Sequence, residues 1–365
     1  MLPVREFGSD EREIMAATEQ LRVGLCDATG LSEEALTFGA QLGLYSVRTG
    51  GASLGLTETN GYWEEAELRA LADRVAAHGM RLEAIENVPH GFTDQILLGL
   101  PGRDAQIANY QTTIRNMGRA GIPILGYHFM PSSVWRTPLA AGRGGAGVTA
   151  FDLALVGTAT AAERRSFTNP GNVTIDAVFA HGDSTVVSAD EMWANYEYFI
   201  RAVLPVAEEA GVKLALHPDD PPVQELGGIA RIFCRPDNFK RAYALANGSP
   251  AWGLDLCLGC CSEMPGGAAN VQEMIEFFGP KGRIFYIHFR DVQGTVPQFQ
   301  ECFIGEGNYN PAETMLRLKK NGFTGFVLDD HVPRMVGDVP YGFRGRAHAI
   351  GYMQALLDAI DTFAP

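Results

Sequence analysis

The sequence predicts one (β/α)8 barrel over residues 1–365, an α/β fold in which parallel strands close into a cylinder inside a ring of helices. Short apolar runs alternate with amphipathic segments from end to end, which is the order expected of strand and helix units connected in series. Eight such runs in 365 residues suit a closed barrel. The first run is not followed by a G-x-G-x-x-G motif, which disfavours an open dinucleotide-binding sheet.

The predicted strands are short apolar runs that end in polar or turn-forming residues. In chain order they span 21–26, 43–48, 81–86, 122–129, 213–217, 252–257, 284–290 and 325–330. The fifth strand is followed by Pro218, which has no N–H to donate to a neighbouring strand and therefore ends the pairing. His217 is thus expected at the tip of a strand.

The predicted helices lie between these strands. The clearest examples are 63–79, 104–120, 189–211 and 311–322, where apolar residues recur at intervals of three and four. Several of these segments end in glycine, as helix C-termini often do. We also expect an extra helix at the N-terminus, ahead of the first strand.

The connection after the fourth strand is unusually long. Residues 131–188 show no clear periodicity and include a glycine-rich stretch at 142–147. Loops of this length are usually functional or disordered. Because it follows a strand, this insertion is expected to rise over the C-terminal mouth of the barrel as a partial lid or a subunit contact, and we expect a homodimer or a larger homo-oligomer.

Composition excludes several classes of partner. A net charge of -14 and a pI of about 5.0 leave no basic surface for nucleic acid or for an anionic membrane. No stretch resembles a secretory signal or a membrane span, so a cytoplasmic location is expected. Six cysteines are too sparse for a disulfide scaffold. The Cys257-x-x-Cys260 spacing is typical of a redox or zinc pair, but a second such pair is missing from the sequence.

The chemistry is expected at the C-terminal ends of the strands, where barrel active sites are assembled. The last four strands each offer a metal-binding side chain there: His217, Cys257, His288 and Asp330. Two imidazoles, a thiolate and a carboxylate suit a borderline divalent cation such as Mn²⁺, Zn²⁺, Co²⁺ or Fe²⁺, and the thiolate disfavours magnesium. A single histidine at a strand end is more often a structural residue, so the hypothesis depends on the four occurring together.

Longer motifs surround these positions. They are "LLGLPGRDAQIANYQTTIRNMGRAGI" (97–122), "GYHFMP" (126–131), "HPDDPP" (217–222), "GLDLCLG" (253–259) and "RIFYIHFRD" (283–291). These motifs, spread over roughly residues 80 to 350, resemble the mannonate dehydratase family, which are metal-dependent sugar-acid lyases on a xylose-isomerase-like barrel.

The resemblance implies dehydration of D-mannonate, or of a related aldonate, to a 2-keto-3-deoxy acid such as 2-keto-3-deoxy-D-gluconate. It implies a manganese-type cation on the same four ligands, and it places the catalytic pair at His331 and Tyr341. Removing a proton from the carbon next to a carboxylate builds up negative charge that a bound cation stabilises. The histidine and the tyrosine then share the roles of base and acid, and the sequence leaves open which has which role.

Two arginines and an aspartate are candidates for binding substrate. Arg290 is either a clamp for the substrate carboxylate, because its planar fork matches one, or a partner in a surface ion pair. Arg346 also favours an anionic substrate. Asp219 either orients substrate hydroxyls and His217 or belongs to an Asx turn in the "DDPP" stretch.

Three further residues have two interpretations each, and a fourth has one. Glu86 ends the third strand and either reaches the site or pairs with a basic residue. Glu301 either binds a sugar hydroxyl or is an ordinary exposed acid. Trp135 either covers the substrate or anchors the long connection. His128 lies within a matching motif, where the family pattern has asparagine, and is a candidate for contacting substrate.

The sequence is also compatible with a second function. Barrels of this class also use a metal to move protons between adjacent carbons, so an isomerase or epimerase of a neutral sugar or keto-sugar is the alternative. The two functions differ in whether they need a carboxylate on the substrate.

Overall fold

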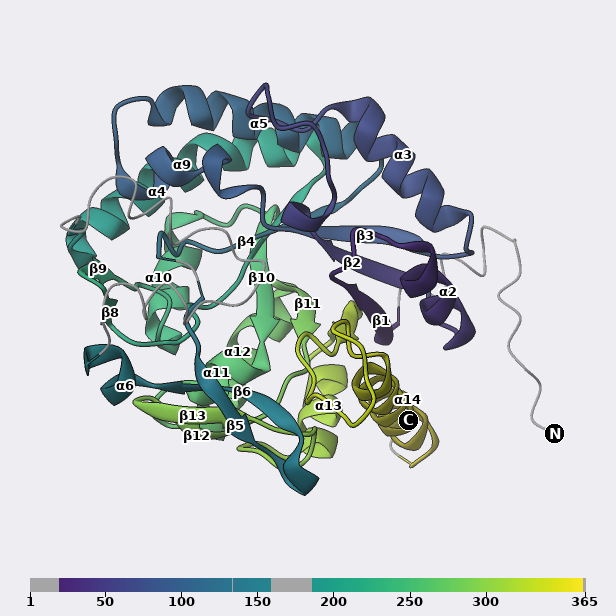
Figure 1. The fold of residues 1–365 in the computed structure, drawn as a ribbon. Helices are drawn as coiled ribbons and strands as arrows, with labels where there is room; N and C mark the ends of the chain where they lie inside the picture. The colour runs from purple at the N-terminus through teal and green to yellow at the C-terminus, as the bar shows by residue number, and fades with distance from the viewer. Residues whose placement is uncertain (1–19, 133, 159–185, 364–365) are drawn as a thin grey trace.

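The computed structural model describes residues 20–132, 134–158 and 186–363 and confirms the predicted barrel (Figure 1). Its strands are β1 (Arg22–Asp27), β2 (Ser46–Gly50), β3 (Arg81–Glu86), β4 (Ile124–Tyr127), β7 (Lys213–Leu216), β10 (Trp252–Cys257), β11 (Ile284–His288) and β14 (Phe326–Leu328). They form one closed parallel sheet in the order β1-β14-β11-β10-β7-β4-β3-β2. Each predicted strand overlaps one of these, with ends that differ by three residues or fewer.

Helices surround the barrel on its outside (Figure 1). They are α2 (Glu33–Gln41), α3 (Glu65–Ala76), α4 (Asp94–Leu98), α5 (Arg103–Arg119), α6 (Leu153–Thr158), α9 (Ala189–Ala210), α10 (Pro236–Leu245), α11 (Leu258–Glu263), α12 (Ala268–Phe278), α13 (Pro311–Lys320) and α14 (Phe343–Phe363). The four clearest predicted helices correspond to α3, α5, α9 and α13. The expected N-terminal helix falls on residues 1–19, outside the described part of the chain.

Helix α9 illustrates how the sequence sets these boundaries. The Ser188 side chain accepts from the backbone N–H of Glu191, and the Glu191 carboxylate accepts from the backbone N–H of Ser188, which together form a capping box. The helix ends at Gly211, which adopts the left-handed conformation that favours glycine. Between these caps an apolar face packs against the barrel, including Trp193 and Phe199.

The insertion after β4 is more regular than its sequence suggests. The strands β5 (Thr137–Ala141) and β6 (Gly147–Asp152) form an antiparallel hairpin that continues through β13 (Gln298–Glu301) to β12 (Val292–Thr295). Residues 137–152 therefore form regular structure although their sequence shows no clear periodicity, and the glycine-rich stretch is largely the hairpin turn. Residues 159–185 lie outside the described part, so the expected lid or subunit contact stays a prediction.

Two layers of core support the site. A large cluster lies between the barrel and its helices, and a smaller one fills the barrel interior with side chains from six of its strands. In the interior, the ring of Tyr286 stacks on Phe326 with centroids 5.3 Å apart. This packed interior forms a floor beneath the strand ends. Among the described residues, the helices are too short or too polar to cross a membrane.

Candidate active site

The barrel register brings the predicted metal ligands to one level. Cys257 pairs with His288 across β10 and β11, and His288 pairs with Leu328, just before Asp330. His217 follows Leu216, the residue that pairs with Leu254 on β10. Because all these strands are parallel, their C-terminal residues meet at the same rim.

The four predicted ligands lie close together. Ligand atoms of Cys257, His288 and Asp330 are all within 4.8 Å of one another. His217 lies within 4.8 Å of Cys257 in one group of potential ligand atoms and within 4.8 Å of His288 in another. The two imidazole rings have centroids 5.2 Å apart.

The chemistry of these side chains suits a bound cation. The buried ring of His288 makes no hydrogen bond of regular geometry, but its Nε2 lies 3.1 Å from Glu86 and 3.5 Å from Asp255, and its Nδ1 lies 3.5 Å from Asp330. His217 Nδ1 lies 2.6 Å from the carbonyl oxygen of Pro218, to which it donates, so Nε2 carries the lone pair of the neutral ring. Asp330 adopts a positive φ of 53°, a strained backbone of the kind that concentrates at functional sites.

The pKa values of these side chains are strongly shifted by burial and by neighbouring charges. Burial lowers the pKa of His217, but Asp255 and the Cys257 sulfur outweigh it and raise that pKa to about 10. Burial raises the pKa of Asp255 to about 8. Burial also disfavours the Cys257 thiolate, yet a hydrogen bond from Cys260 and the charge of Arg290 hold its pKa well below the usual value.

Asp255 was missed by the sequence reasoning. It shares a group of potential ligand atoms with Glu86, His217 and His288. The available signal was its place in "GLDLC", where an aspartate stands two residues before Cys257 in an otherwise apolar strand. Residues two apart on a strand face the same side, so both point into the barrel.

Arg290 is buried at the centre of an ionic network. Its guanidinium lies 2.8 Å from both Glu263 and Glu301 and 3.1 Å from both Asp220 and Asp330. A role as a clamp on substrate would require some of these contacts to break. The network also includes Arg136, which binds both carboxylate oxygens of Asp220 at 2.5 and 2.6 Å.

The candidate catalytic pair lies beside this network. His331 Nδ1 is 2.9 Å from Glu301 Oε1, and its Nε2 is 3.7 Å from Asp330 Oδ1. Its side chain is 32 % exposed, in contrast to the buried ligands, so it borders solvent. The Tyr341 hydroxyl donates to the carbonyl oxygen of Cys26 at 2.8 Å, at the neighbouring end of β1.

Two acids predicted to bind substrate have protein partners. Glu86 forms an ion pair with Arg48 and accepts from the Tyr286 hydroxyl at 3.2 Å. Asp219 accepts from the backbone N–H of Phe233 at 2.7 Å, while its second oxygen is buried without a hydrogen bond. Burial raises the pKa of Asp219 to about 6.

The other predicted contacts divide between structural packing and the site. Trp135 is buried in a cluster with Phe151 and Phe299, and its indole N–H donates to a backbone carbonyl. These contacts fit the alternative in which Trp135 anchors the long connection. Arg346 pairs with Asp329 at 3.0 Å and lies over the Tyr341 ring. His128 is partly buried, and burial together with the charge of His217 lowers its pKa to about 3, so its ring is neutral.

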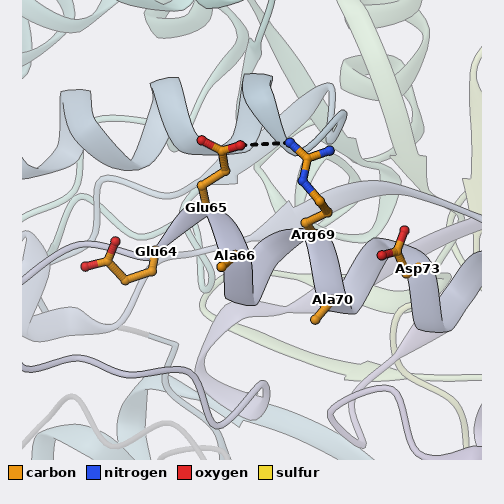
Figure 2. A pocket seen from close by; sticks show the side chains of 6 residues that line it. All are labelled: Glu64, Glu65, Ala66, Arg69, Ala70 and Asp73. Carbon is orange, nitrogen blue, oxygen red and sulfur yellow. Dashed lines mark hydrogen bonds and ion pairs between the residues drawn. The ribbon is translucent and has the colours of Figure 1, made fainter.

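A surface hollow on α3 lies apart from this chemistry. Figure 2 shows its lining of Glu64, Glu65, Ala66, Arg69, Ala70 and Asp73, with an ion pair between Glu65 and Arg69. The hollow is shallow and lies along an outer helix, whereas the candidate ligands lie at the strand ends.

Comparisons with known proteins agree with the geometry. The family model described as D-mannonate dehydratase (UxuA) matches residues 44–364. The chain is 31 % identical to mannonate dehydratase 2 of Halalkalibacterium halodurans, over 83 % of this chain and 89 % of that protein. It is 32 % identical to the mannonate dehydratase of Geobacillus thermodenitrificans, over 82 % of this chain and 84 % of that protein.

Solved structures also place the chain among mannonate dehydratases. The crystal structure of the mannonate dehydratase from Streptococcus suis serotype 2 has a TM-score of 0.80 and 27 % identity, covering 94 % of this chain and 96 % of that chain. An L-ribulose 3-epimerase, at 14 % identity and a TM-score of 0.53 over 95 % of this chain and 99 % of that chain, shares only the barrel fold. The chain belongs to the D-mannonate dehydratase family, which confirms the hydro-lyase class and the xylose-isomerase-like barrel predicted from its sequence.

Proposed function

We propose that this enzyme dehydrates D-mannonate to 2-keto-3-deoxy-D-gluconate, or carries out the same reaction on a related aldonate. The observation that carries the proposal is the meeting of four metal-binding side chains from consecutive barrel strands at one rim, in a chain of this family. The reaction removes the C2 proton and the C3 hydroxyl, releases water and leaves a 2-keto acid.

The proposed cation site consists of His217, Cys257, His288 and Asp330. The surroundings of His288 support this assignment, because its buried ring lies among the carboxylates of Glu86, Asp255 and Asp330, and a cluster of buried anions suits a bound cation. When bound, a divalent cation would act as a Lewis acid that holds the substrate carboxylate and stabilises the negative charge formed next to it. We propose Mn²⁺ as the preferred ion, with Fe²⁺, Co²⁺ and Zn²⁺ compatible with the same donors.

The proton transfers are assigned to His331 and Tyr341. Glu301 accepts a hydrogen bond from the Nδ1–H group of His331, which leaves Nε2 as the atom that gains or loses a proton during the reaction. Burial raises the pKa of Tyr341, so its hydroxyl stays protonated at neutral pH and is suited to donate to the departing C3 hydroxyl. This arrangement favours His331 as the base and Tyr341 as the acid.

Exchange of the C2 proton with solvent deuterium tests this assignment. A base variant, His331→Asn, should lose both exchange and turnover. An acid variant, Tyr341→Phe, should keep exchange while losing turnover. The opposite pattern would reverse the two roles.

The network around Arg290 is proposed to position the site rather than to bind substrate. Its guanidinium contacts the predicted ligands Cys257 and Asp330, and it also contacts Glu301, which orients His331. Recognition of the substrate carboxylate then depends mainly on the cation. His128 and the free oxygen of Asp219 are proposed to bind substrate hydroxyls.

The predictions on assembly and location stay as proposals. We propose a homo-oligomer in which the 131–188 insertion contributes a lid or a subunit contact, and light scattering at assay concentrations tests its mass. Six buried thiols without a disulfide suit a reducing compartment such as the cytoplasm.

The decisive experiment is a screen of chelator-stripped protein against a panel of aldonates, with and without added Mn²⁺, that measures 2-keto-3-deoxy acids. Mn²⁺-dependent product from D-mannonate would support the proposal. Product from another aldonate alone would identify that aldonate, rather than D-mannonate, as the substrate. Turnover that requires no carboxylate on the substrate would contradict it.

A further inference from the structure

We propose that Cys260 gives this site a second metal-binding mode, in which His217, Cys257 and Cys260 hold a thiophilic ion such as Zn²⁺ or Cd²⁺. The side-chain nitrogen and the two sulfurs of these residues lie within 4.8 Å of one another, and all three residues are buried. The inference rests on the proposed function only because both modes share His217 and Cys257.

The start of α11 places the two sulfurs together. Cys257 is the N-cap of the helix, and its sulfur accepts from the backbone N–H of Cys260 at 3.4 Å. Helical side chains lean toward the N-terminus of their helix, so Cys260 in the first turn leans back toward Cys257. Cys261, one residue on, packs into the apolar core instead.

The distances suit a tetrahedral soft ion. Zinc–sulfur bonds of about 2.3 Å and zinc–nitrogen bonds of about 2.0 Å require donor atoms roughly 3.5–3.8 Å apart in a tetrahedron. Donor atoms already within 4.8 Å of one another reach that separation by small side-chain rotations. A vacant fourth position would be open to water or to a neighbouring carboxylate.

Arg290 supports this mode from outside the ligand set. Its Nη2 lies 3.3 Å from the Cys257 sulfur and 3.0 Å from the Cys260 sulfur, and so can donate to both. Hydrogen bonds of this kind fix ligand orientation and stabilise negatively charged thiolates. The guanidinium is held in place by Glu263 and Glu301.

The two modes differ in the softness of their donor atoms. The proposed Mn²⁺ set has one thiolate, whereas the second mode exchanges His288 and Asp330 for a second thiolate. Soft thiolates favour Zn²⁺ and Cd²⁺ over Mn²⁺. Because His217 and Cys257 belong to both sets, a thiophilic ion excludes the productive cation, and Cys260 should make the enzyme sensitive to inhibition by such ions.

Cadmium is the probe, since its bonds to thiolates absorb in the near ultraviolet. Reduced, chelator-stripped protein is titrated with Cd²⁺ while this absorption is followed, and Mn²⁺ binding is measured separately by electron paramagnetic resonance. The Cys260→Ser variant should lose about half of the cadmium–thiolate absorption and bind Cd²⁺ at least about 10-fold more weakly, with little change in Mn²⁺ binding. The Cys261→Ser variant is the matched control and should behave like the native protein.

Asp330→Asn separates this inference from the proposed function. The variant should lose Mn²⁺ binding but keep the cadmium–thiolate absorption, because Asp330 belongs to the first set alone. Unchanged Mn²⁺ binding in this variant would contradict the proposed ligand set and leave the cadmium result intact. Cadmium absorption and affinity in Cys260→Ser equal to those of the native protein would overturn the second mode.

Discussion

Replacing Glu301 with glutamine should reduce kcat far more than it reduces stability. Glu301 is only 2 % exposed and accepts from His331 at 2.9 Å and from Arg290 at 2.8 Å. Arg136 is a third and more distant cation, at 3.4 Å. Glutamine keeps the size of the side chain but removes the negative charge that all three donors face.

The cost in stability follows from the remaining partners. Exchanging a charge-assisted hydrogen bond for a neutral one costs about 1 kcal/mol, so the two short contacts together cost about 2 kcal/mol. The larger penalty of about 3–5 kcal/mol for an unpaired buried charge is not expected. Arg290 keeps Asp220 and Asp330, and Arg136 keeps Asp220, so neither arginine loses all compensation.

The cost in activity follows from the orientation of His331. Without the carboxylate, His331 Nδ1 is no longer the preferred protonated nitrogen, and Nε2 is no longer reserved for the substrate. General acid–base catalysis contributes about 10²–10⁴ to the rate, and we expect a loss of kcat in that range. Metal content should not change, because Glu301 is outside the proposed ligand set.

The assay combines kcat and KM on the accepted aldonate, metal content and urea unfolding. Glu306→Gln is the control, because Glu306 lies nearby but pairs with Arg143 at the surface, where such pairs contribute about 0–1 kcal/mol. If Glu301→Gln lowers kcat by less than about 10-fold, or about 1.4 kcal/mol, Glu301 does not orient the catalytic histidine and the reasoning is refuted.

Four further outcomes are expected. Cys257→Ser should weaken Mn²⁺ binding in a folded barrel, and unchanged metal content and activity would contradict its assignment as a ligand. Chelation should lower the melting temperature, and restoring Mn²⁺ to about 100 times its Kd should stabilise the protein by about 2.7 kcal/mol; a melting curve insensitive to Mn²⁺ would argue against a built site. Arg346→Met leaves Asp329 buried without its arginine and should cost about 3–5 kcal/mol in urea unfolding, and a loss below 1 kcal/mol would show that Asp329 finds another partner. Tyr341→Phe removes the hydrogen bond to Cys26 and should cost only about 0.5–1.5 kcal/mol of stability. It should also lower kcat by about 10²–10⁴, and full activity in a folded Phe variant would remove Tyr341 from the reaction.

The barrel and the proposed ligands could be predicted because both depend on local patterns. A strand shows itself as a short apolar run, and a barrel site forms where successive strands end. His217, Cys257, His288 and Asp330 each close or follow such a run, so their meeting required only the fold.

The small sheet could not be predicted because its pairing is long-range. Strand β6 pairs with β13, which lies almost 150 residues further along the chain, as in the contact between Phe151 and Phe299. Strand β5 is an edge strand that contains Pro138, and proline lowers the local strand signal while being tolerated at an edge. Neither feature produces a periodic pattern in sequence.

The sequence left Arg290 as either a carboxylate clamp or an ion-pair partner, because its ionic partners are distant along the chain. A lone arginine beside a strand tip has the right shape for a carboxylate, and its actual partners come from segments up to 70 residues away. The network holds two arginines, Arg136 and Arg290, and four groups that favour the anionic form, Asp220, Cys257, Glu301 and Asp330. Burial together with Asp220 raises the pKa of Glu263 to about 8, so that acid is largely neutral at pH 7. The neighbouring anions outweigh burial and raise the pKa of His217 and of His288, so without a bound ion these two imidazoles are protonated and offset the excess of two negative charges. A divalent cation bound among these groups would displace the two imidazole protons and take over their charge.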